Sequence, residues 1–564
     1  MESAIWARPG CYEHPVDWDQ HFEPLSLPDM LRHTAERAGD RPLLDFYGRR
    51  FSYARCLDVA RRFACGLNAL GVAPGDRVGL YLPNVPHYVA AYYGAMMAGA
   101  IVVNFSPLYT VEELAHQAQD SGIATLVTLS AHPLFDNAAA LLDRGSVQRL
   151  VVGSVAGVLP AGKALLYRLF KQRGDDAVVP HDPRILAFGA LLANDGTAPL
   201  PSIDPVRDLA LLQYTGGTTG RPKGAMLTHQ NLTANARQVN MMDPWRGGED
   251  RILGVLPFFH VFANTAVLNR SVVNGGEIVM LPRFDGRQAL AAIRRTRVTS
   301  VPGVPTMFQA LLDSPHLNRA DFAAVRICIS GGAPLPHVLK ERFEAAVGVR
   351  LVEGYGLTET SGVVSANPYD KAGKSGTIGQ PIPGTRVKLL DREDPHRAAP
   401  DGEPGELAIA GPQIMRGYWN NPDADADVFV DGYLRTGDVG TIDAEGYISV
   451  VDRIKDMIAV GGFKVFPSQV EEVLYRHPAV REAIVIGIPD AYRGESPKAF
   501  VTLRPDAPAV DGETLKTWLN AQLGKHERVS AVEIRESLPR TLVGKLSRKE
   551  LVAEERIKAG LGAG

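Results

Sequence analysis

Residues 76–105 read DRVGLYLPNVPHYVAAYYGAMMAGAIVVNF, and this stretch decides the fold class. A β-rich run (DRVGLYLP) leads into a helical pattern (HYVAAYYGAMMAG), which leads into a second β-rich run (AIVVNF). Further β-rich runs recur between amphipathic stretches, among them RILGVLP, GGEIVMLP, VTSVPGV and VRICISGG. This alternation predicts an α/β architecture with largely parallel sheets.

The same stretch raises the question of a membrane span. No Asp, Glu, Lys or Arg occurs between Arg77 and Glu112, and a spanning helix needs about 20 predominantly apolar residues. Pro83 and Pro86 interrupt one side of the apolar run, however, and Asn104 the other. We therefore predict a buried helix followed by a buried strand.

Size, charge and cysteine content narrow the class of protein. The 564 residues carry 60 Lys and Arg against 63 Asp and Glu, a formal net charge of −3, which argues against a nucleic-acid partner. At about 150 residues a domain, the length predicts two to four domains. Four cysteines without a CxxC pair, and an N-terminus without an apolar signal-peptide run, lead us to expect a reducing, cytoplasmic location.

The pattern of predicted strands changes in the second part of the chain. After Asp391, short strands bounded by Gly and Asp (GELAIAG, GYLRTGDVG, GYISVVDR) are typical of antiparallel hairpins. A smaller unit of alternating helices and strands begins at Ser468. We place a boundary near residues 452–455 and expect two domains, residues 1–452 and 453–564.

The most informative motif is QYTGGTTGRPKGAMLTH, residues 213–229. Glycines let backbone N–H groups approach an anion, hydroxyls donate further hydrogen bonds, and Lys223 supplies a positive charge. The motif is not a Walker loop, because Pro222 precedes the lysine and Gly224 follows it. It predicts a polyphosphate-binding loop, with a flexible Gly/Thr surface turn as the alternative.

These residues resemble the signature loop of the adenylate-forming enzymes, which include acyl-CoA synthetases, firefly luciferases and peptide-synthetase adenylation domains. Further motifs occur in that superfamily's order: LPFFHVFA (256–263), SGGAPL (330–335), EGYGLTET (353–360), LRTGD (434–438), DRIKDMI (452–458), GGFKVFPSQVEEVL (461–474) and LPRTLVGKLSRKEL (538–551). The resemblance covers residues 46–551 and is nearest to bacterial long-chain fatty-acid CoA ligases. It implies an α/β fold with a large N-terminal domain of mixed sheets flanked by helices, a small β-barrel-like subdomain, and a small mobile α+β C-terminal domain.

The implied reaction has two steps and uses ATP and CoA as co-substrates with Mg²⁺. A carboxylate attacks the α-phosphate of ATP to give an acyl-adenylate and pyrophosphate, and the thiol of CoA then displaces AMP. Both steps develop charge, and fixed donors or cations aimed at that charge lower the barrier.

The resemblance assigns many residues to the nucleotide: Thr215, Gly216, Gly217, Thr218, Thr219, Gly220, Lys223, Gly332, Ala333, Glu353, Gly354, Tyr355, Thr358, Asp438, Arg453 and Lys545. In this family Tyr355 is the residue that stacks against adenine, opposite the turn at Gly332 and Ala333. Asp438 corresponds to the ribose ligand, and Arg453 to a second ribose contact. From the residues alone, a core aromatic and an exposed turn aspartate are the alternatives.

Lys545 is implied as the main catalytic residue, bridging the substrate carboxylate and the α-phosphate, with Thr218 and Lys223 assisting. The alternative role for Lys545 is that of a solvent-exposed basic residue at the start of a helix, and this is the interpretation that we give to Lys549. Glu359 with Thr218 is implied as the metal site, since Mg²⁺ takes oxygen ligands and needs only one or two carboxylates. A helix-capping pair is the alternative for Glu359.

The second step requires the small domain to turn. Lys455 corresponds to the family's hinge, about which that domain rotates, and a rigid linker strand is the alternative. Gly461, Gly462 and Phe463 correspond to the wall of the CoA tunnel.

Substrate choice is less specified by the sequence. The acyl pocket is expected at His260, Val261, Phe262, Ala263, Gly303 and Val304, with His260 as a wall and gate residue. A long-chain fatty acid is the leading substrate. The alternatives are dicarboxylic acids, medium-chain acids and aryl acids such as 4-coumarate. Asn264, Asn269 or Arg270 could bind the distal carboxylate of a dicarboxylic acid. Other rivals are an acyl-AMP ligase that loads a carrier protein, a luciferase-like monooxygenase and a non-catalytic paralogue.

Residues 158–173, VLPAGKALLYRLFKQR, form a basic amphipathic pattern. Such a helix can lie on an anionic membrane surface, which predicts peripheral contact with the inner face of the cytoplasmic membrane. Packing against the protein's own large domain is the alternative. The resemblance also makes a homodimer an expectation.

Overall fold

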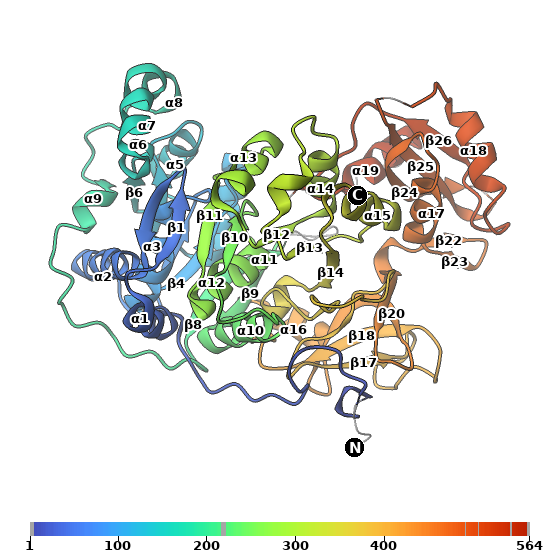
Figure 1. Ribbon diagram of the computed structural model, residues 1–564, viewed down its shortest axis with the longest axis horizontal. Coiled ribbons are helices and arrows are strands. Elements are labelled where there is room, and N and C mark those ends of the chain that lie inside the picture. The colour runs from blue at the N-terminus through green and yellow to red at the C-terminus, as the bar shows by residue number, and fades with distance from the viewer. Residues whose placement is uncertain are drawn as a thin grey trace.

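Four β-sheets organise the chain in the computed structural model, which describes residues 5–8, 10–215, 222–490, 492–505, 507–541 and 544–560. Figure 1 shows two of these sheets side by side in the blue-to-green part of the chain. The third, antiparallel sheet lies below them in the orange part, and the fourth forms the red end of the chain. The expected α/β architecture is confirmed.

A seven-stranded sheet lies at the N-terminal side of the large body. Its order is β7 (Ile185–Ala187), β6 (Arg149–Gly153), β5 (Thr125–Leu129), β3 (Arg77–Leu80), β4 (Ile101–Asn104), β8 (Leu209–Thr215) and β9 (Lys223–Thr228). Neighbouring strands are parallel except for β8 and β9, which are antiparallel. The accompanying helices are α2 (Tyr53–Ala69), α3 (Pro86–Met97), α4 (Val111–Ser121) and α5 (Leu134–Asp143).

The apolar stretch 76–105 folds as β3, α3 and β4, as the sequence predicts. Every residue of α3 is buried, which explains why the helix needs no polar face. It begins at Pro86, where the missing N–H of proline costs nothing. Among the described residues, the helices are too short or too polar to cross a membrane.

A nine-stranded sheet forms the centre of the molecule. Its order is β16 (Gln380–Pro381), β15 (Ser365–Ala366), β14 (Leu351–Tyr355), β13 (Ile327–Gly331), β12 (Ser300–Gly303), β10 (Arg251–Gly254), β11 (Glu277–Met280), β1 (Pro42–Phe46) and β2 (Arg49–Ser52). Strands β14 to β1 along this order are parallel, and both ends are antiparallel. Helices with this sheet are α1 (Leu27–Ala38), α10 (His229–Met241), α13 (Gly286–Thr296), α14 (Pro305–Leu312) and α15 (His337–Val347).

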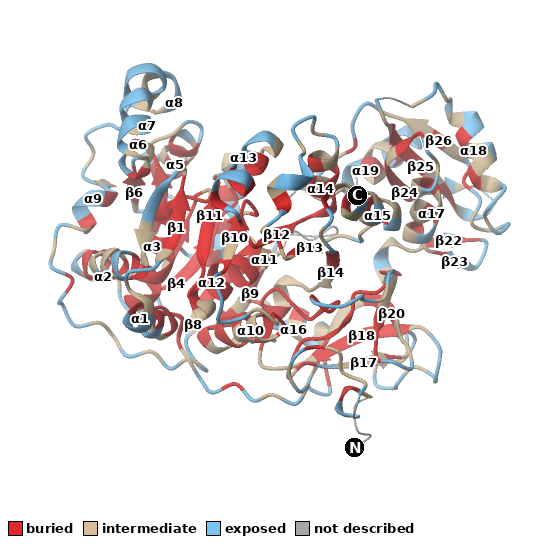
Figure 2. Cartoon of the chain, in the orientation of Figure 1, coloured by how far each residue is buried: buried red, intermediate tan, exposed pale blue. Residues whose placement is uncertain are grey.

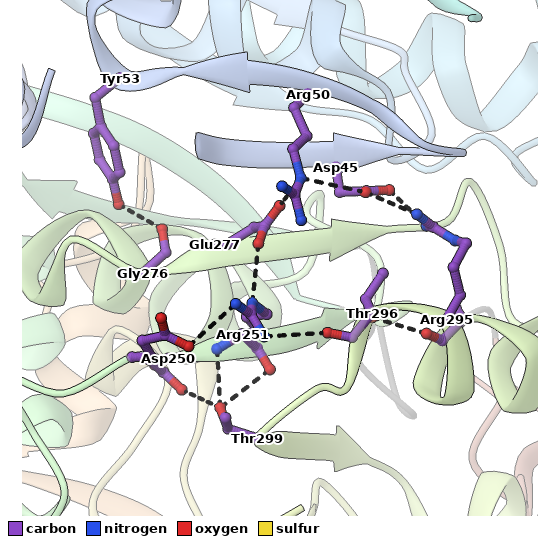
Figure 3. Close-up of polar contacts among 12 residues, drawn as sticks. Asp45, Arg50, Tyr53, Asp250, Arg251, Gly276, Glu277, Arg295, Thr296 and Thr299 are labelled. Atoms are coloured by element: carbon purple, nitrogen blue, oxygen red, sulfur yellow. Dashed lines mark hydrogen bonds and ion pairs between the residues drawn. The ribbon is translucent and has the colours of Figure 1, made fainter. Parts of the chain in front are cut away.

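Charged groups fasten the early strands β1 and β2 to this sheet (Figure 3). Arg295 binds Asp45 through both terminal nitrogens, at 2.6 and 2.9 Å. Arg50 and Arg251 flank Glu277, at 3.0 and 3.3 Å. Asp45 and Glu277 are nearly inaccessible to solvent, so these pairs are screened less than surface pairs.

The third sheet is antiparallel throughout, where the small barrel-like subdomain is expected. It contains β17 (Arg386–Leu390), β18 (Gly405–Ala410), β20 (Tyr433–Ile442), β19 (Phe429–Val430) and β21 (Ile448–Arg453). The short helix α16 (Pro422–Val428) precedes β19. The appearance of short strands bounded by Gly and Asp after Asp391 thus corresponds to a change from parallel to antiparallel pairing.

The C-terminal part has its own sheet and core. The strands are β23 (Phe463–Val465), β22 (Ile458–Val460), β25 (Gly494–Leu503), β24 (Val480–Asp490) and β26 (Ala531–Ile534), with helices α17 (Pro467–Tyr475), α18 (Gly512–Asn520) and α19 (Lys549–Lys558). Its core includes Leu474, Val485 and Leu515. The 3₁₀ turn η6 (Ile454–Asp456) connects β21 of the third sheet to β22 of this one.

Short helical segments complete the chain. They are η1 (Ile5–Ala7), α6 (Val155–Val158), α7 (Ala161–Leu166), the π-turn η2 (Tyr167–Lys171), α8 (Gln172–Asp175), α9 (Phe188–Leu191), α11 (Val261–Ala263), the π-helix η3 (Asn264–Asn269), α12 (Arg270–Asn274), η4 (Arg319–Phe322) and η5 (Thr358–Thr360). Figure 2 shows α7 and α8 as an exposed projection, in contrast to the buried strands of the two large sheets.

Candidate functional site

A cleft of about 2620 Å³ lies where the nine-stranded sheet, the antiparallel sheet and the C-terminal part meet. The carboxyl ends of the parallel strands β13 and β14 open into it, which is where α/β sheets place ligands. Residues far apart in the sequence line it together, among them Gly332, Tyr355, Asp438, Arg453 and Lys545. The cleft therefore unites the motifs that the sequence singles out.

A buried carboxylate lies on one wall of the cleft. Asp438, only 3% exposed, accepts a hydrogen bond from the phenol of Tyr355 at 2.5 Å. The guanidinium of Arg453 lies 3.2 Å from its other oxygen, because β20 and β21 pair these two residues. Burial raises the pKa of Asp438, and the charge of Arg453 opposes that shift. This trio is suited to holding a diol against a fixed carboxylate.

The turn after β13 forms another wall. Gly332 has φ = +80°, a conformation that favours glycine. The N–H of Leu335 in the same turn donates to Glu353 at 3.1 Å. Burial raises the pKa of Glu353 to about 8. Glu353 and its neighbour Gly354 line the cleft, and the carboxyl of Glu353 also shapes this turn.

Lys545 enters the cleft from the C-terminal part and lies directly against Gly332. A Cβ atom added at Gly332 would be only 2.6 Å from Lys545 Nζ. Burial and the charge of Arg453 lower the pKa of Lys545 to about 8. Burial and the charge of Lys545 lower the pKa of His260 to about 3, so this imidazole is neutral at physiological pH.

Two polar contacts beside Lys545 join the C-terminal part to the large body. Thr306 donates to the carbonyl of Gly544 at 2.7 Å. Arg481 forms an ion pair with Asp313 at 2.8 Å. The first contact involves the residue next to Lys545, so it helps to hold the lysine in the cleft.

Glu359 lies on the cleft wall near the end of the glycine-rich motif. Its carboxylate accepts a hydrogen bond from Tyr418 at 2.7 Å, and the ammonium of Lys223 lies 4.9 Å from the centre of the Tyr418 ring. The described residues contain no cluster of three metal-ligating side chains. A single carboxylate fits Mg²⁺, which keeps waters and shares phosphate oxygens, better than a metal that needs a protein cage.

The flanks of the glycine-rich motif are adjacent, since Thr215 at the end of β8 pairs with Lys223 at the start of β9. Thr215 and Thr358 both line the cleft. The predicted ligands Gly216, Gly217, Thr218, Thr219 and Gly220 lie outside the described residues.

Three of the six residues expected at the acyl pocket line the cleft. His260, Val261 and Phe262 line the cleft. Ala263 and Val304 are instead fully buried in the core, and Gly303 faces the ring of Phe308, which a Cβ atom would approach to 3.0 Å. A largely apolar arm of the cleft is lined by Val239, Ala266, Val363, Ala366 and Tyr369, which pack together with Phe262.

The side chains offered for a distal carboxylate already have partners within the protein. Asn264 accepts from Tyr92 at 2.9 Å, and Asn269 accepts from Tyr93 at 2.8 Å. Arg270 forms buried ion pairs with Asp250, at 2.9 Å, and with Asp243. These contacts explain why π-helix η3 and α12 can bury polar groups. Arg270 also lines the cleft, and its Nε has no hydrogen-bond partner among the described residues.

The segment expected to contact CoA lies away from this cleft. Gly461 and Gly462 form the positive-φ turn between β22 and β23. Phe463 is 61% exposed and stacks on His526, with 5.1 Å between the ring centres. Lys455, in η6, does line the cleft, and burial lowers its pKa. Lys545 and the 461–463 turn are thus not in the same site.

Comparison with known proteins identifies the family. The AMP-binding enzyme model matches residues 31–419, and the AMP-binding enzyme C-terminal domain model matches residues 469–545. A long-chain-fatty-acid–CoA ligase of Bacillus subtilis (strain 168) is 41% identical over 557 residues, covering 97% of this chain and 98% of that protein. A feruloyl-CoA synthase of Amycolatopsis sp is 37% identical over 505 residues, covering 89% and 94%.

A solved structure agrees with the fold. The anthranilate CoA ligase AuaEII, in complex with anthranoyl-AMP, superposes with a TM-score of 0.84 at 25% identity, covering 96% of this chain and 99% of that one. The match extends through both the large body and the C-terminal part. The chain therefore belongs to the AMP-binding enzyme family, the adenylate-forming acid–CoA ligases.

Proposed function

We propose that this acid–CoA ligase acts on long-chain fatty acids, in two steps through an acyl-adenylate. The observation that carries the proposal is the largely apolar arm of the cleft, which begins beside Phe262, close to the Lys545 site. A fatty acid bound in this arm would have its carboxylate near the lysine and its hydrocarbon chain among apolar side chains. The 41% identity to a long-chain-fatty-acid–CoA ligase supports the same substrate class.

For adenylation, the proposed role of Lys545 is to hold the substrate carboxylate and the α-phosphate together. Two anions that must react repel each other, and a buried ammonium between them offsets that repulsion as charge moves onto the phosphate. With a pKa of about 8, Lys545 is mainly protonated at pH 7. The glycine-rich motif is proposed to assist this step through Lys223 and through Thr218, which lies outside the described residues.

For nucleotide binding, Asp438 is proposed to accept hydrogen bonds from the two ribose hydroxyls. Arg453 opposes the rise that burial causes in the pKa of this carboxylate. Tyr355 and the turn at Gly332 and Ala333 are proposed to enclose the adenine ring, with Glu353 supporting the turn. Thr215 and Thr358 would donate to the phosphates.

Glu359 is the residue proposed to hold Mg²⁺, together with Thr218. When bound, Mg²⁺ would neutralise phosphate charge. Tyr418 donates to Glu359 and so orients the carboxylate before the nucleotide arrives.

For the thiol step, we propose that residues 453–564 rotate as a domain relative to residues 1–452, with Lys455 as the hinge. The rotation would withdraw Lys545 and bring Gly461, Gly462 and Phe463 to the cleft, where CoA must reach the adenylate. The position of these glycines away from the cleft, with Lys545 inside it, supports a separate arrangement for each step.

An aryl acid is the second candidate substrate, because a feruloyl-CoA synthase is 37% identical. A homodimer and a location at the cytoplasmic membrane also stay proposals.

The test of the substrate is pyrophosphate release from ATP over acids of varied length, with and without CoA. We expect release that is strongest with long-chain fatty acids, and formation of the acyl-CoA only when CoA is added. Release that is weak with every fatty acid yet strong with an aryl or dicarboxylic acid would overturn the assignment.

A further inference from the structure

One projecting helical segment exposes an unusual number of large apolar side chains. In residues 161–175, Leu165 is 59% exposed, Leu166 57%, Leu169 65% and Phe170 79%. Val178 follows at 93%. Soluble proteins rarely leave a contiguous apolar patch of this kind without a partner. We refer to Leu165, Leu166, Leu169 and Phe170 as the apolar face.

These side chains share one side of the segment. Leu165 and Leu169, like Leu166 and Phe170, are four residues apart, which brings them together on a helix. Because they are exposed, they do not pack against the large domain, which was the alternative to a membrane role. Figure 2 shows the segment α7–α8 as a mostly exposed projection.

The opposite side of the segment is anchored, so its orientation is fixed. Tyr167 donates to Asp176 at 2.6 Å. Lys163 donates to the carbonyl of Tyr47 at 3.2 Å, and Arg49 donates to the carbonyl of Gly157 at 2.7 Å. These hydrogen bonds hold the segment in one orientation, so that the apolar face points outward. A disordered tail would not present its apolar side chains on one defined side.

Positive charge surrounds the apolar face. Lys163, Arg168 and Lys171 are exposed, and the acidic residues Asp175 and Asp176 follow at the end of the segment. Cations beside an apolar helix face match the headgroups and the acyl region of an anionic bilayer. A second copy of this chain fits less well, since a two-fold contact would bring Arg168 and Lys171 toward their own counterparts.

The apolar face adjoins a cavity that shares a wall residue with the active-site cleft. This cavity, of about 1330 Å³, is lined by Leu166, Phe170 and Phe259, among others. Phe259 also lines the cleft, next to His260. A bilayer in contact with the apolar face would therefore lie beside a largely apolar cavity that shares a wall with the cleft.

We propose that residues 161–175 dock the protein on the surface of an anionic bilayer through the apolar face and its surrounding cations. Docking places the cavity mouth against the membrane, where long-chain acids partition. This benefit to catalysis rests on the proposed fatty-acid substrate, whereas the docking itself does not.

The experiment is co-sedimentation of the full-length protein with vesicles of phosphatidylcholine alone or with added phosphatidylglycerol. We expect binding to the anionic vesicles that weakens as salt is raised. Leu166→Ser with Phe170→Ser should reduce binding by about tenfold or more, because each apolar side chain contributes on the order of that factor. Arg168→Gln with Lys171→Gln should remove the preference for anionic vesicles.

The matched control is Val206→Ser with Ile557→Ser, which removes apolar side chains of similar exposure, 54% and 62%, elsewhere on the surface. This control should bind vesicles like the wild type. Turnover of a short, water-soluble acid reports folding and should not change in any variant.

Three results would overturn the proposal: no binding of the wild type to anionic vesicles, equal loss in the control, or unchanged binding by the Leu166/Phe170 variant. A change from dimer to monomer in that variant, without vesicle binding by the wild type, would assign the face to a second copy. Failure of the substrate assignment looks different, since vesicle binding would persist while no fatty acid forms a thioester.

Discussion

The phenol of Tyr355 donates to the carboxylate of Asp438, with 2.5 Å between Oη and Oδ2, and so joins β14 of the central sheet to β20 of the antiparallel sheet. The bond fixes the position of a carboxylate that is 3% exposed. Tyr355 therefore has a polar function in addition to the ring surface that the sequence suggested.

Removing the Tyr355 hydroxyl should weaken nucleotide binding more than chemistry. Tyr355→Phe is expected to raise the KM for ATP about tenfold with little change in kcat, since a hydrogen bond to a charged group contributes about 1.5–3 kcal/mol. Asp438→Ala should be more severe, because it removes the carboxylate proposed to bind the ribose and leaves the half-exposed Arg453 without this partner. Steady-state kinetics with varied ATP measures both, and an unchanged KM in both variants would refute the ribose assignment.

Lys545→Ala should separate the two half-reactions. Adenylation is expected to fall by about two to three orders of magnitude, as for other contacts made to developing charge. Thioester formation from supplied acyl-AMP should stay nearly intact, because the lysine acts only in the first step. Pyrophosphate release and single-turnover thioester formation measure the two steps, with Lys549→Ala as the control. Equal loss in both steps would refute the two-arrangement mechanism.

The pH dependence of adenylation should reflect the ionisation of Lys545. Its pKa is lowered to about 8 by burial and by Arg453, and only the protonated form bridges two anions. The value of kcat/KM for ATP should therefore fall as the pH rises through about 8. Lys545→Arg keeps its charge and should flatten this alkaline limb, whatever its absolute rate. An alkaline limb that is identical in the arginine variant would assign the titration to another group.

Gly332→Ala tests the contact between the turn and the lysine. The new Cβ would lie 2.5 Å from Lys545 Cε, so the lysine must move. Adenylation should fall about as far as in Lys545→Ala, while thioester formation from acyl-AMP is retained. Gly402→Ala is the matched control, since Gly402 has φ = +81° and nothing within 4 Å of an added Cβ. Equal loss in the control would attribute the effect to backbone strain.

Glu353→Gln should make the protein more stable at alkaline pH. The pKa of Glu353 is raised from 4.5 to about 8 in the folded state, so ionised glutamate is favoured on unfolding. The wild type therefore loses stability as the pH rises from about 4.5 to 8. Glutamine still accepts from Leu335 but does not ionise. Thermal unfolding should show an advantage for the variant of about a few degrees that grows from pH 5 to pH 8, and an advantage independent of pH would contradict this account.

The sequence predicted those parts of the fold that depend on local pattern. The order of strand, buried helix and strand in residues 76–105 follows from alternation, and the antiparallel sheet after Asp391 follows from its short, turn-bounded strands. The motif resemblance correctly brought Tyr355, Asp438 and Lys545 into one cleft.

The acyl pocket could not be predicted in the same way. Whether a residue faces the cleft depends on the phase of its helix, and the π-helix Asn264–Asn269 breaks the 3.6-residue period on which such a prediction rests. Ala263 is buried in the core, whereas Ala266 lines the cleft. The pairing of Tyr418 with Glu359 joins residues 59 positions apart, and no local pattern signals it.

The place of β1 in the central sheet has a consequence for biosynthesis. On one side this strand pairs with β11, from Leu44 opposite Ile278 to Phe46 opposite Met280, and its Asp45 is clamped by Arg295. A ribosome releases residues in order, so a nascent chain holds β1 without this neighbour until more than 230 further residues have emerged. Pairing between strands that are far apart in the sequence forms slowly, and until it forms the unpaired strand edge can bind other chains. The large domain should thus depend on chaperone protection during translation more than the C-terminal part, whose strands pair within a much shorter span.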